Sequence, residues 1–163
     1  MKLSRKAKRY DDTVLPGDFV GFEPFSDGDA GTEGEVSGAL RRTRDGVELG
    51  HITLERLAAK KQTFAKLKSR AEVLTRQLTY LDEHLEIVDH DRRGMYIQLR
   101  SLPPYKDDSQ IRFNEISIGR DKVVVKRIAF YRRDEVKQQV AFSLTEDLLA
   151  RLMSDLRQVL SPV

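Results

Sequence analysis

The stretch TLERLAAKKQTFAKLKSRAEVLTRQLTYLDEHLEIV, from Thr53 to Val88, carries the strongest periodic signal in the chain. Apolar residues recur at the first and fourth positions of successive heptads, with Lys60 as the exception. The residues that form this seam are Leu57, Phe64, Leu67, Ala71, Leu74, Leu78, Leu81, Leu85 and Val88. Such a seam is typical of a coiled coil. The sequence therefore predicts one long helix over residues 53–93, capped by Thr53 and stopped at Gly94.

The charges beside this seam are sorted along its length. Basic residues such as Lys66 and Arg70 lie in its first part, and acidic residues such as Glu83 and Glu86 lie near its end. An antiparallel partner would set the basic part of one chain against the acidic part of the other. The pattern thus favours an antiparallel coiled-coil homodimer. The alternative is that the same stripe packs along the chain's own sheet.

Composition limits the class of protein. The chain has 163 residues, 39% hydrophobic and 34% charged, with a net charge of +3, which suits one folded domain and permits binding to polyanions. The absence of cysteine excludes disulfides, thiol catalysis and cysteine-based metal sites. No run of about 18 apolar residues and no apolar signal core stand out. We therefore expect a soluble, cytoplasmic protein without a membrane partner.

The first 52 residues read as an appendage to the main domain. Lys2, Arg5, Lys6, Lys8 and Arg9 form a basic arm, and a glycine-rich acidic stretch follows. Within the region, Val36 to Arg42 and Val47 to Ile52 predict a small hairpin around Asp45-Gly46. The expected organisation is a flexible region over 1–52, the heptad helix over 53–93 and a folded domain over 94–163.

After Gly94 the apolar residues alternate. Four strands are predicted, from Met95 to Leu102, from Ile111 to Ile118, from Lys122 to Arg132 and from Val136 to Leu144. The apolar parity of the second strand shifts after Asn114, which suggests a bulge near Glu115. Ser143-Leu144-Thr145-Glu146 is a capping box that starts a helix over 146–160. The predicted fold class is α+β: a long coiled-coil helix, then a four-stranded antiparallel meander backed by a C-terminal helix.

No stretch of the sequence indicates catalysis or a cofactor. There is no G-x-S-x-G elbow, no P-loop and no G-x-G-x-x-G motif after a strand. Asp89-His90-Asp91 with Glu86, one helical turn back, carries side chains that bind metals. Solvated residues at the end of a helix give the same pattern in the sequence. We therefore expect a non-catalytic protein with no metal and no cofactor.

The predicted sheet is basic. Between Arg92 and Lys137, twelve Lys or Arg outnumber six Asp or Glu. If helix 146–160 covers the face with Ile97 and Leu99, the opposite face carries a basic and aromatic strip, made of Tyr96, Arg100, Arg112, Lys126, Phe130, Arg132 and Lys137. Single-stranded nucleic acid is bound by surfaces of this kind, because the cations contact the phosphates and the aromatic rings stack on the bases. The simpler interpretation is a solvated polar face on an adaptor that contacts only proteins.

The element order ββββα over residues 95–160 supports the first interpretation. The portion from Asn114-Glu115-Ile116-Ser117-Ile118 through Val123-Val124-Val125, Phe130-Tyr131-Arg132-Arg133 and Phe142-Ser143-Leu144-Thr145 resembles single-stranded-DNA-binding transcriptional coactivators. In topology it is similar to the Whirly and purine-rich-element-binding proteins as well. The resemblance covers less than half of the chain, and the heptad helix in front of the sheet departs from those families. It implies a dimeric module that binds single-stranded nucleic acid.

Overall fold

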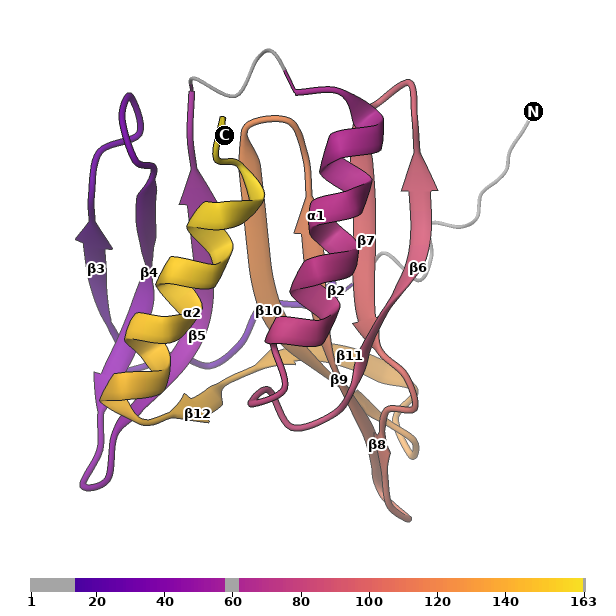
Figure 1. Cartoon of the computed structure of the whole chain (residues 1–163). Helices are drawn as coiled ribbons and strands as arrows, with labels where there is room; N and C mark the ends of the chain where they lie inside the picture. Colours follow the sequence, from indigo (N-terminus) through magenta and orange to yellow (C-terminus); the bar gives the residue numbers. More distant parts are fainter. Residues whose placement is uncertain (1–13, 58–61, 163) are drawn as a thin grey trace.

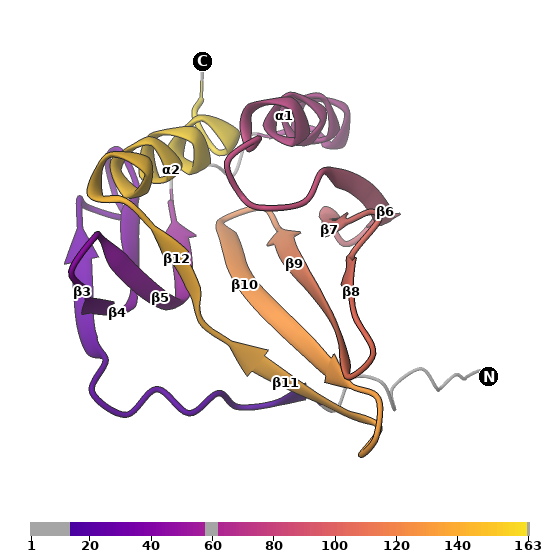
Figure 2. The same cartoon turned by 90° about the horizontal axis from the view of Figure 1, so that it is seen from below.

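The computed structural model of the chain describes residues 14–57 and 62–162. In these residues the strands join into one eleven-stranded sheet, and two helices lie side by side against it. The sheet is strongly curved, and the helices lie on its concave side (Figures 1 and 2). The apolar core fills the space between the helices and this concave face.

The main path of the sheet runs β3-β4-β5-β10-β9-β7-β6. The strands on this path are β3 (Glu23–Asp27), β4 (Glu35–Arg42), β5 (Val47–Glu55), β10 (Lys122–Tyr131), β9 (Gln110–Ile118), β7 (Tyr96–Ser101) and β6 (Leu85–Asp91). Four shorter strands extend one end: β11 (Val136–Val140) pairs with β10, β12 (Phe142–Leu144) with β5, β8 (Tyr105–Lys106) with β9, and β2 (Val14–Leu15) with β11. All of these pairs are antiparallel except β2 with β11.

Each helix begins at a threonine. In α1 (Phe64–Gln77) the Thr63 hydroxyl accepts a hydrogen bond from the backbone N–H of Lys66, and in α2 (Glu146–Val159) the Thr145 hydroxyl accepts one from Leu148. These bonds satisfy N–H groups that the first helical turn leaves unpaired. The C-terminal helix lies where the sequence predicts it, although its N-cap is Thr145 and not Ser143.

The predicted long coiled-coil helix is wrong. Residues 47–55 belong to strand β5, helix α1 ends at Gln77, and residues 85–91 form strand β6. Two heptads, from Phe64 to Leu74, are a true helical stripe. The longer pattern arose because Leu78 and Leu81 after α1, and Leu85 and Val88 in β6, also fall at the first and fourth heptad positions.

The predicted α+β class with a four-stranded meander is also wrong. Strands make up 46% of the structure and helices 19%, and the chain forms one large sheet. The four strands predicted after Gly94 neighbour one another within this sheet. Strand β5 also pairs with β10, along the edge that β11 uses and opposite β9. The predicted hairpin around Asp45-Gly46 is confirmed, because β4 pairs with β5. It lies in the same sheet, and the predicted boundary at residue 53 falls inside β5.

Within the described residues, neither helix is long and apolar enough to cross a membrane.

Candidate functional site

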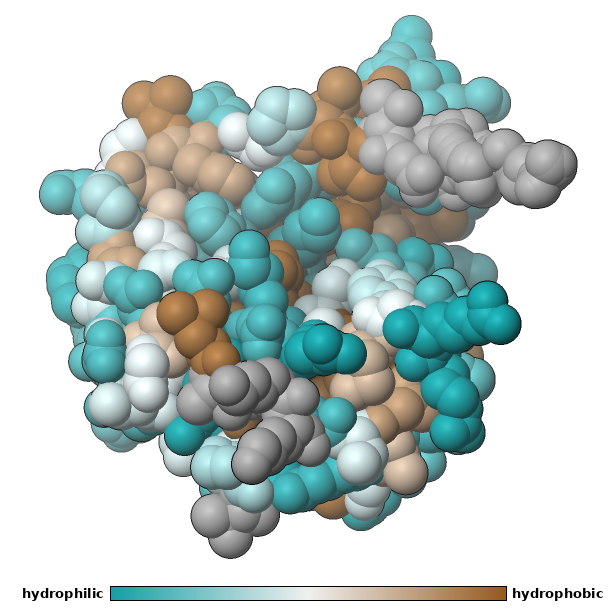
Figure 3. All heavy atoms as spheres, turned by 90° about the horizontal axis from the view of Figure 1, so that it is seen from above, coloured by the Kyte–Doolittle hydropathy of each residue, from teal (hydrophilic) through white to brown (hydrophobic). Residues whose placement is uncertain are grey.

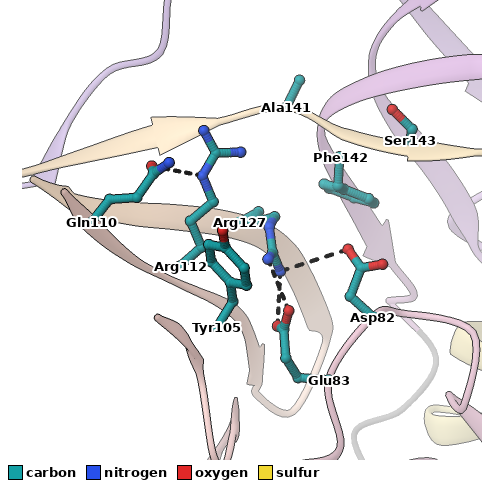
Figure 4. A pocket seen from close by; sticks show the side chains of 9 residues that line it. All are labelled: Asp82, Glu83, Tyr105, Gln110, Arg112, Arg127, Ala141, Phe142 and Ser143. Atoms are coloured by element: carbon teal, nitrogen blue, oxygen red, sulfur yellow. Dashed lines mark hydrogen bonds and ion pairs between the residues drawn. The ribbon is translucent and has the colours of Figure 1, made fainter. Parts of the chain in front are cut away.

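A pocket of about 690 Å³ lies among strands β8, β9 and β10, the loop between α1 and β6, and the segment around β12. Figure 2 views the molecule from the end at which β8 and β12 lie. Strands β8, β9 and β10 supply Tyr105, Gln110, Arg112 and Arg127. The loop between α1 and β6 supplies Asp82 and Glu83, and the segment around β12 supplies Ala141, Phe142 and Ser143 (Figure 4). We call this cavity the end pocket. It continues the concave face of the sheet beyond the part that the helices cover.

The floor of the end pocket is a buried ion pair. Arg127 Nη1 and Nη2 each donate a hydrogen bond of 2.9 Å to one carboxylate oxygen of Glu83. Arg127 Nη1 also donates to Asn114 Oδ1 at 2.9 Å. The side chains of Arg127 and Glu83 are only 7% and 15% exposed. A two-point contact between guanidinium and carboxylate is the strongest form of side-chain ion pair, and its fixed geometry orients both groups.

Ser101 and the backbone carbonyl of Leu81 complete this network. Ser101 Oγ donates to Glu83 Oε1 at 2.9 Å and accepts a bond of 2.7 Å from the backbone N–H of Asn114. Asn114 Nδ2 donates to the carbonyl of Leu81 at 3.1 Å. Buried polar groups are tolerated when they are bonded in this way. The network therefore fixes the loop between α1 and β6 onto strands β7, β9 and β10.

Arg112 differs from Arg127 in having unused donors. Its Nε donates to Gln110 Oε1 at 2.8 Å, but its two terminal nitrogens have no acceptor among the described residues. Figure 4 shows this guanidinium between Gln110 and Ala141, at the pocket wall. A guanidinium with two free nitrogens is a ready contact for a carboxylate or phosphate.

Beside Arg112, Tyr105 is held in place by the β8–β9 turn. Its hydroxyl donates to Asp107 Oδ2 at 2.8 Å. Asp107 Oδ1 also accepts from the backbone N–H groups of Ser109 and Gln110. The hydrogen bond from Tyr105, followed by those from the turn, holds the pKa of Asp107 far below its ordinary value. The same bond to Asp107 raises the pKa of Tyr105, so the phenol stays protonated.

The register of β9 places Arg112 on the concave face, contrary to the sequence prediction. The pairing of β9 with β10 runs without interruption from Ile118 opposite Val123 to Gln110 opposite Tyr131. The predicted bulge near Glu115 is therefore absent. Because successive side chains alternate, Asn114 and Arg112 share the face of the core residues Ile116 and Ile118.

The rest of the predicted basic strip lies on the convex face or beside it. Tyr96, Arg100, Lys126, Phe130 and Lys137 alternate with concave-face residues on their strands, and Arg132 follows directly after β10. Five of the seven predicted residues thus share one face. Phe113 lies on the same face, buried beneath the guanidinium of Arg100 at 4.9 Å from its ring centre.

Glu115 reduces the basic character of this convex face. It accepts a hydrogen bond from Arg100 at 3.1 Å and lies directly opposite Lys126 on the neighbouring strand. Opposite charges in such cross-strand positions attract one another. The local excess of cations counted along the sequence is therefore divided between two faces and partly neutralised.

The predicted oligomerisation residues lie mostly in the chain's own core. The buried ones are Phe64, Leu67, Ala71, Leu74, Leu78, Leu81 and Leu85. Leu57 and Val88, at the two ends of the predicted seam, are 60% and 41% exposed. The stripe therefore packs within one chain, against α2, β6 and β7, which was the alternative that the sequence left open.

No group of three or more His, Asp or Glu side chains within residues 14–57 and 62–162 is placed to hold a metal ion. A groove of about 380 Å³ runs between the helices beside Val73, Gln77 and Gln158. On the end of the molecule opposite the end pocket, hydrophilic side chains separate smaller hydrophobic areas (Figure 3). The predicted basic arm, Lys2 to Arg9, lies outside the described residues.

Comparisons with models of protein families, with curated proteins and with solved structures found no match. The resemblance of residues 95–160 to single-stranded nucleic-acid-binding modules therefore stays a hypothesis. Fold and site together define a curved sheet around two helices with a polar pocket at one end.

Sequence reasoning missed the end pocket. It placed Lys126 rather than Arg127 on the face opposite the helices, and Lys126 does lie on this convex face. It gave no role to Arg127. The partner of Arg127 is Glu83, 44 positions away in the chain. The signal that was present is a charged residue amid the apolar run of β10, because such a residue needs a partner when its strand is covered on both faces.

Proposed function

We propose that the protein is a non-catalytic binding protein and that the end pocket holds a small organic anion. The observation that carries the proposal is the contrast between the two arginines of the pocket. Both terminal nitrogens of Arg127 donate to Glu83, and Nη1 donates to Asn114 as well, whereas both terminal nitrogens of Arg112 lack an acceptor among the described residues. A concave pocket with a few convergent polar groups is the usual form of a small-molecule site.

The other walls favour an organic ligand over an inorganic ion. Phe142 and the ring of Tyr105 offer apolar surface. Gln110 Nε2 offers a hydrogen bond beside Arg112, and Ser143 Oγ offers another beyond Phe142 (Figure 4). The nine lining residues include no histidine and no cysteine, and neither a nucleophile with an adjacent base nor a metal site supports catalysis here. On sequence grounds, we place the protein in the cytoplasm.

Hexanoate is a suitable first probe, because it has one carboxylate and a short apolar chain. Titration into ¹⁵N-labelled protein should shift the amide signals of Gln110, Arg112 and Phe142. Arg112→Gln should weaken binding about ten- to hundredfold, because hydrogen bonds to a charged group contribute about 1.5–3 kcal/mol. Lys126→Gln, on the convex face, is the matched control and should leave the affinity unchanged. Shifts confined to the convex face would contradict the proposal.

A second candidate function is the binding of single-stranded nucleic acid to the convex face. It is favoured by the shared face of Tyr96, Arg100, Lys126, Phe130 and Lys137, and opposed by the neutralising position of Glu115. Four cations on or beside this face, Arg100, Lys126, Arg132 and Lys137, would make the affinity fall about fiftyfold between 50 and 200 mM salt.

Fluorescence anisotropy with a labelled single-stranded oligonucleotide tests this candidate. Lys126→Glu with Lys137→Glu should abolish the signal, and Arg112→Gln should leave it intact because Arg112 lies on the other face. A flat trace for the wild-type protein at 50 mM salt would reject the candidate. Flat results with both hexanoate and the oligonucleotide would favour an adaptor whose sheet surfaces contact only other proteins.

A further inference from the structure

We infer that the ligand of the end pocket is an extended zwitterion, with an anionic group on Arg112 and an ammonium group on Asp82. This inference rests on the proposed function and specifies its ligand. Two arginines and two carboxylates line the pocket: Arg112, Arg127, Asp82 and Glu83.

Glu83 and Arg127 are not available to a ligand. Glu83 accepts two bonds from Arg127 and one from Ser101, and Arg127 donates to Asn114 as well. Both side chains are largely buried. The pair therefore forms a neutral floor, and the net charge available to a ligand comes from Arg112 and Asp82 alone.

Asp82 is only loosely engaged. Its Oδ2 lies 4.0 Å from Arg127 Nη1, the single ionic contact of its side chain among the described residues, and the side chain is 70% exposed. Its backbone has a φ of +41°, a conformation that aspartate and asparagine adopt more readily than most residues. This backbone bend presents the carboxylate at the rim of the pocket.

Arg112 and Asp82 lie on different walls, with the Arg127–Glu83 pair between them (Figure 4). One compact ion cannot neutralise both, whereas a chain with a charge at each end can span the floor. Phe142, beside the floor, offers apolar surface to the middle of such a chain. The chemical class is a carboxylate and a primary ammonium joined by an apolar linker.

Three probes with the same carbon chain test the inference. They are 6-aminohexanoate, hexanoate and hexylamine, titrated separately and followed by the amide signals of the pocket residues. We expect 6-aminohexanoate to bind at least about tenfold more tightly than hexanoate, because the second charge gains its own charge-assisted hydrogen bond. Hexylamine should bind most weakly. A series with 4-aminobutanoate and 8-aminooctanoate then gives the separation of the two contacts.

Asp82→Asn is the decisive variant, because asparagine keeps the positive φ and removes only the charge. It should reduce the affinity for 6-aminohexanoate to that for hexanoate and leave hexanoate binding unchanged. Asp134→Asn, in the exposed β10–β11 turn, is the matched control. Arg112→Gln should weaken the binding of both carboxylate probes.

The outcomes separate the inference from the proposed function. If hexanoate binds through Arg112 but 6-aminohexanoate binds no more tightly, or if Asp82→Asn has no effect, the zwitterion is rejected and the anion pocket stands. If no probe shifts the pocket signals at about 20 mM, both the zwitterion and the anion pocket are rejected.

Discussion

Arg127 is the residue on which the end pocket depends. A guanidinium loses its hydration when a strand carries it into the core, and it is stable there only if a carboxylate and further acceptors replace the water. Glu83 and Asn114 do so, and Ser101 in turn orients Glu83. The four side chains come from three strands and one loop, so their assembly requires the completed fold.

Arg127→Met should destabilise the protein by about 3–5 kcal/mol, because it leaves the Glu83 carboxylate buried without its partner. Urea denaturation followed by circular dichroism measures the change. Arg41→Met is the matched control, since Arg41 pairs with Glu48 at the surface and exposed pairs contribute at most about 1 kcal/mol. The double variant Arg127→Met with Glu83→Leu should recover much of the loss. Equal costs for Arg127→Met and Arg41→Met would contradict the structural role.

A second residue-scale prediction concerns Glu33, in the β3–β4 turn. The Thr32 hydroxyl donates to Glu33 Oε1 at 2.6 Å, and the backbone N–H of Asp29 donates to the same oxygen at 2.9 Å. In that order these bonds lower the pKa of Glu33 from its usual 4.5 to about 2. The turn is therefore stabilised above pH 4.5, and this contribution is lost as the pH falls toward 2.

Thr32→Val should raise the pKa of Glu33 part of the way back toward 4.5, because the backbone hydrogen bonds from Asp29 and from Glu33 itself remain. A titration of the side-chain carboxyl by NMR measures it. Asp107, whose pKa is lowered by a separate turn, should titrate unchanged in the variant. An unchanged pKa of Glu33 would show that the hydroxyl does not make this bond in solution.

At the scale of elements, the central observation is that α1 is short. Helix α1 has 14 residues, or about 21 Å at 1.5 Å per residue, which is close to the length of the seven-residue strand β6 that it contacts, about 23 Å at 3.3 Å per residue. Its buried stripe faces α2, β6 and β7. Two ties reinforce this packing: Tyr80, after α1, donates a hydrogen bond of 2.8 Å to Asp155 on α2, and Arg151 lies over the Tyr80 ring.

The packing of α1 is tested by Leu74→Ala and Val73→Ala. Leu74 is fully buried and Val73 is 39% exposed, so they differ mainly in what surrounds them. Leu74→Ala should cost about 2–5 kcal/mol, whereas Val73→Ala should cost about 0.5 kcal/mol. Light scattering should give the wild-type mass for both variants. A lower mass for Leu74→Ala at unchanged stability would show that the stripe holds two chains together.

At the scale of the whole molecule, one core joins segments that are far apart in the sequence. Strand β10 pairs with β5 on one side and with β9 on the other, and β12 returns to pair with β5. Residues before and after α1 thereby share the same hydrophobic cluster. A chain built in this way lacks an internal boundary at which one part can unfold alone.

We therefore expect a single cooperative unfolding transition. Urea curves from far-ultraviolet circular dichroism and from tyrosine fluorescence should coincide, which is the test of two-state behaviour. The chain has five tyrosines and no tryptophan, so the fluorescence signal comes from residues 80–131 and from Tyr10. Two separated transitions would show that the N-terminal strands form a separate unit.

Several elements follow from the sequence alone, because their signals are local. The helix from Glu146 to Val159 has an apolar stripe and a capping signal in adjacent residues, although its cap is Thr145 and not the predicted Ser143, and the β4–β5 hairpin has Asp45-Gly46 between its strands. Alternation also predicts the strands of the second half. Each of these signals is contained within about 15 residues, so no distant contact is needed to read it.

Only the tertiary structure decided how the stretch from Thr53 to Val88 divides into strand, helix and strand. Its ends pair with β10 and β7. The hydrogen bonds of these pairings outweigh the helical preference of the stretch, and periodicity alone does not distinguish its helical part from its strands. The face of Arg112 depends on an uninterrupted register between β9 and β10, and a shift of one residue reverses every side chain. The partner of Arg127 is likewise set by the fold, because burial of its charge requires Glu83, which approaches only when the loop after α1 closes over the sheet.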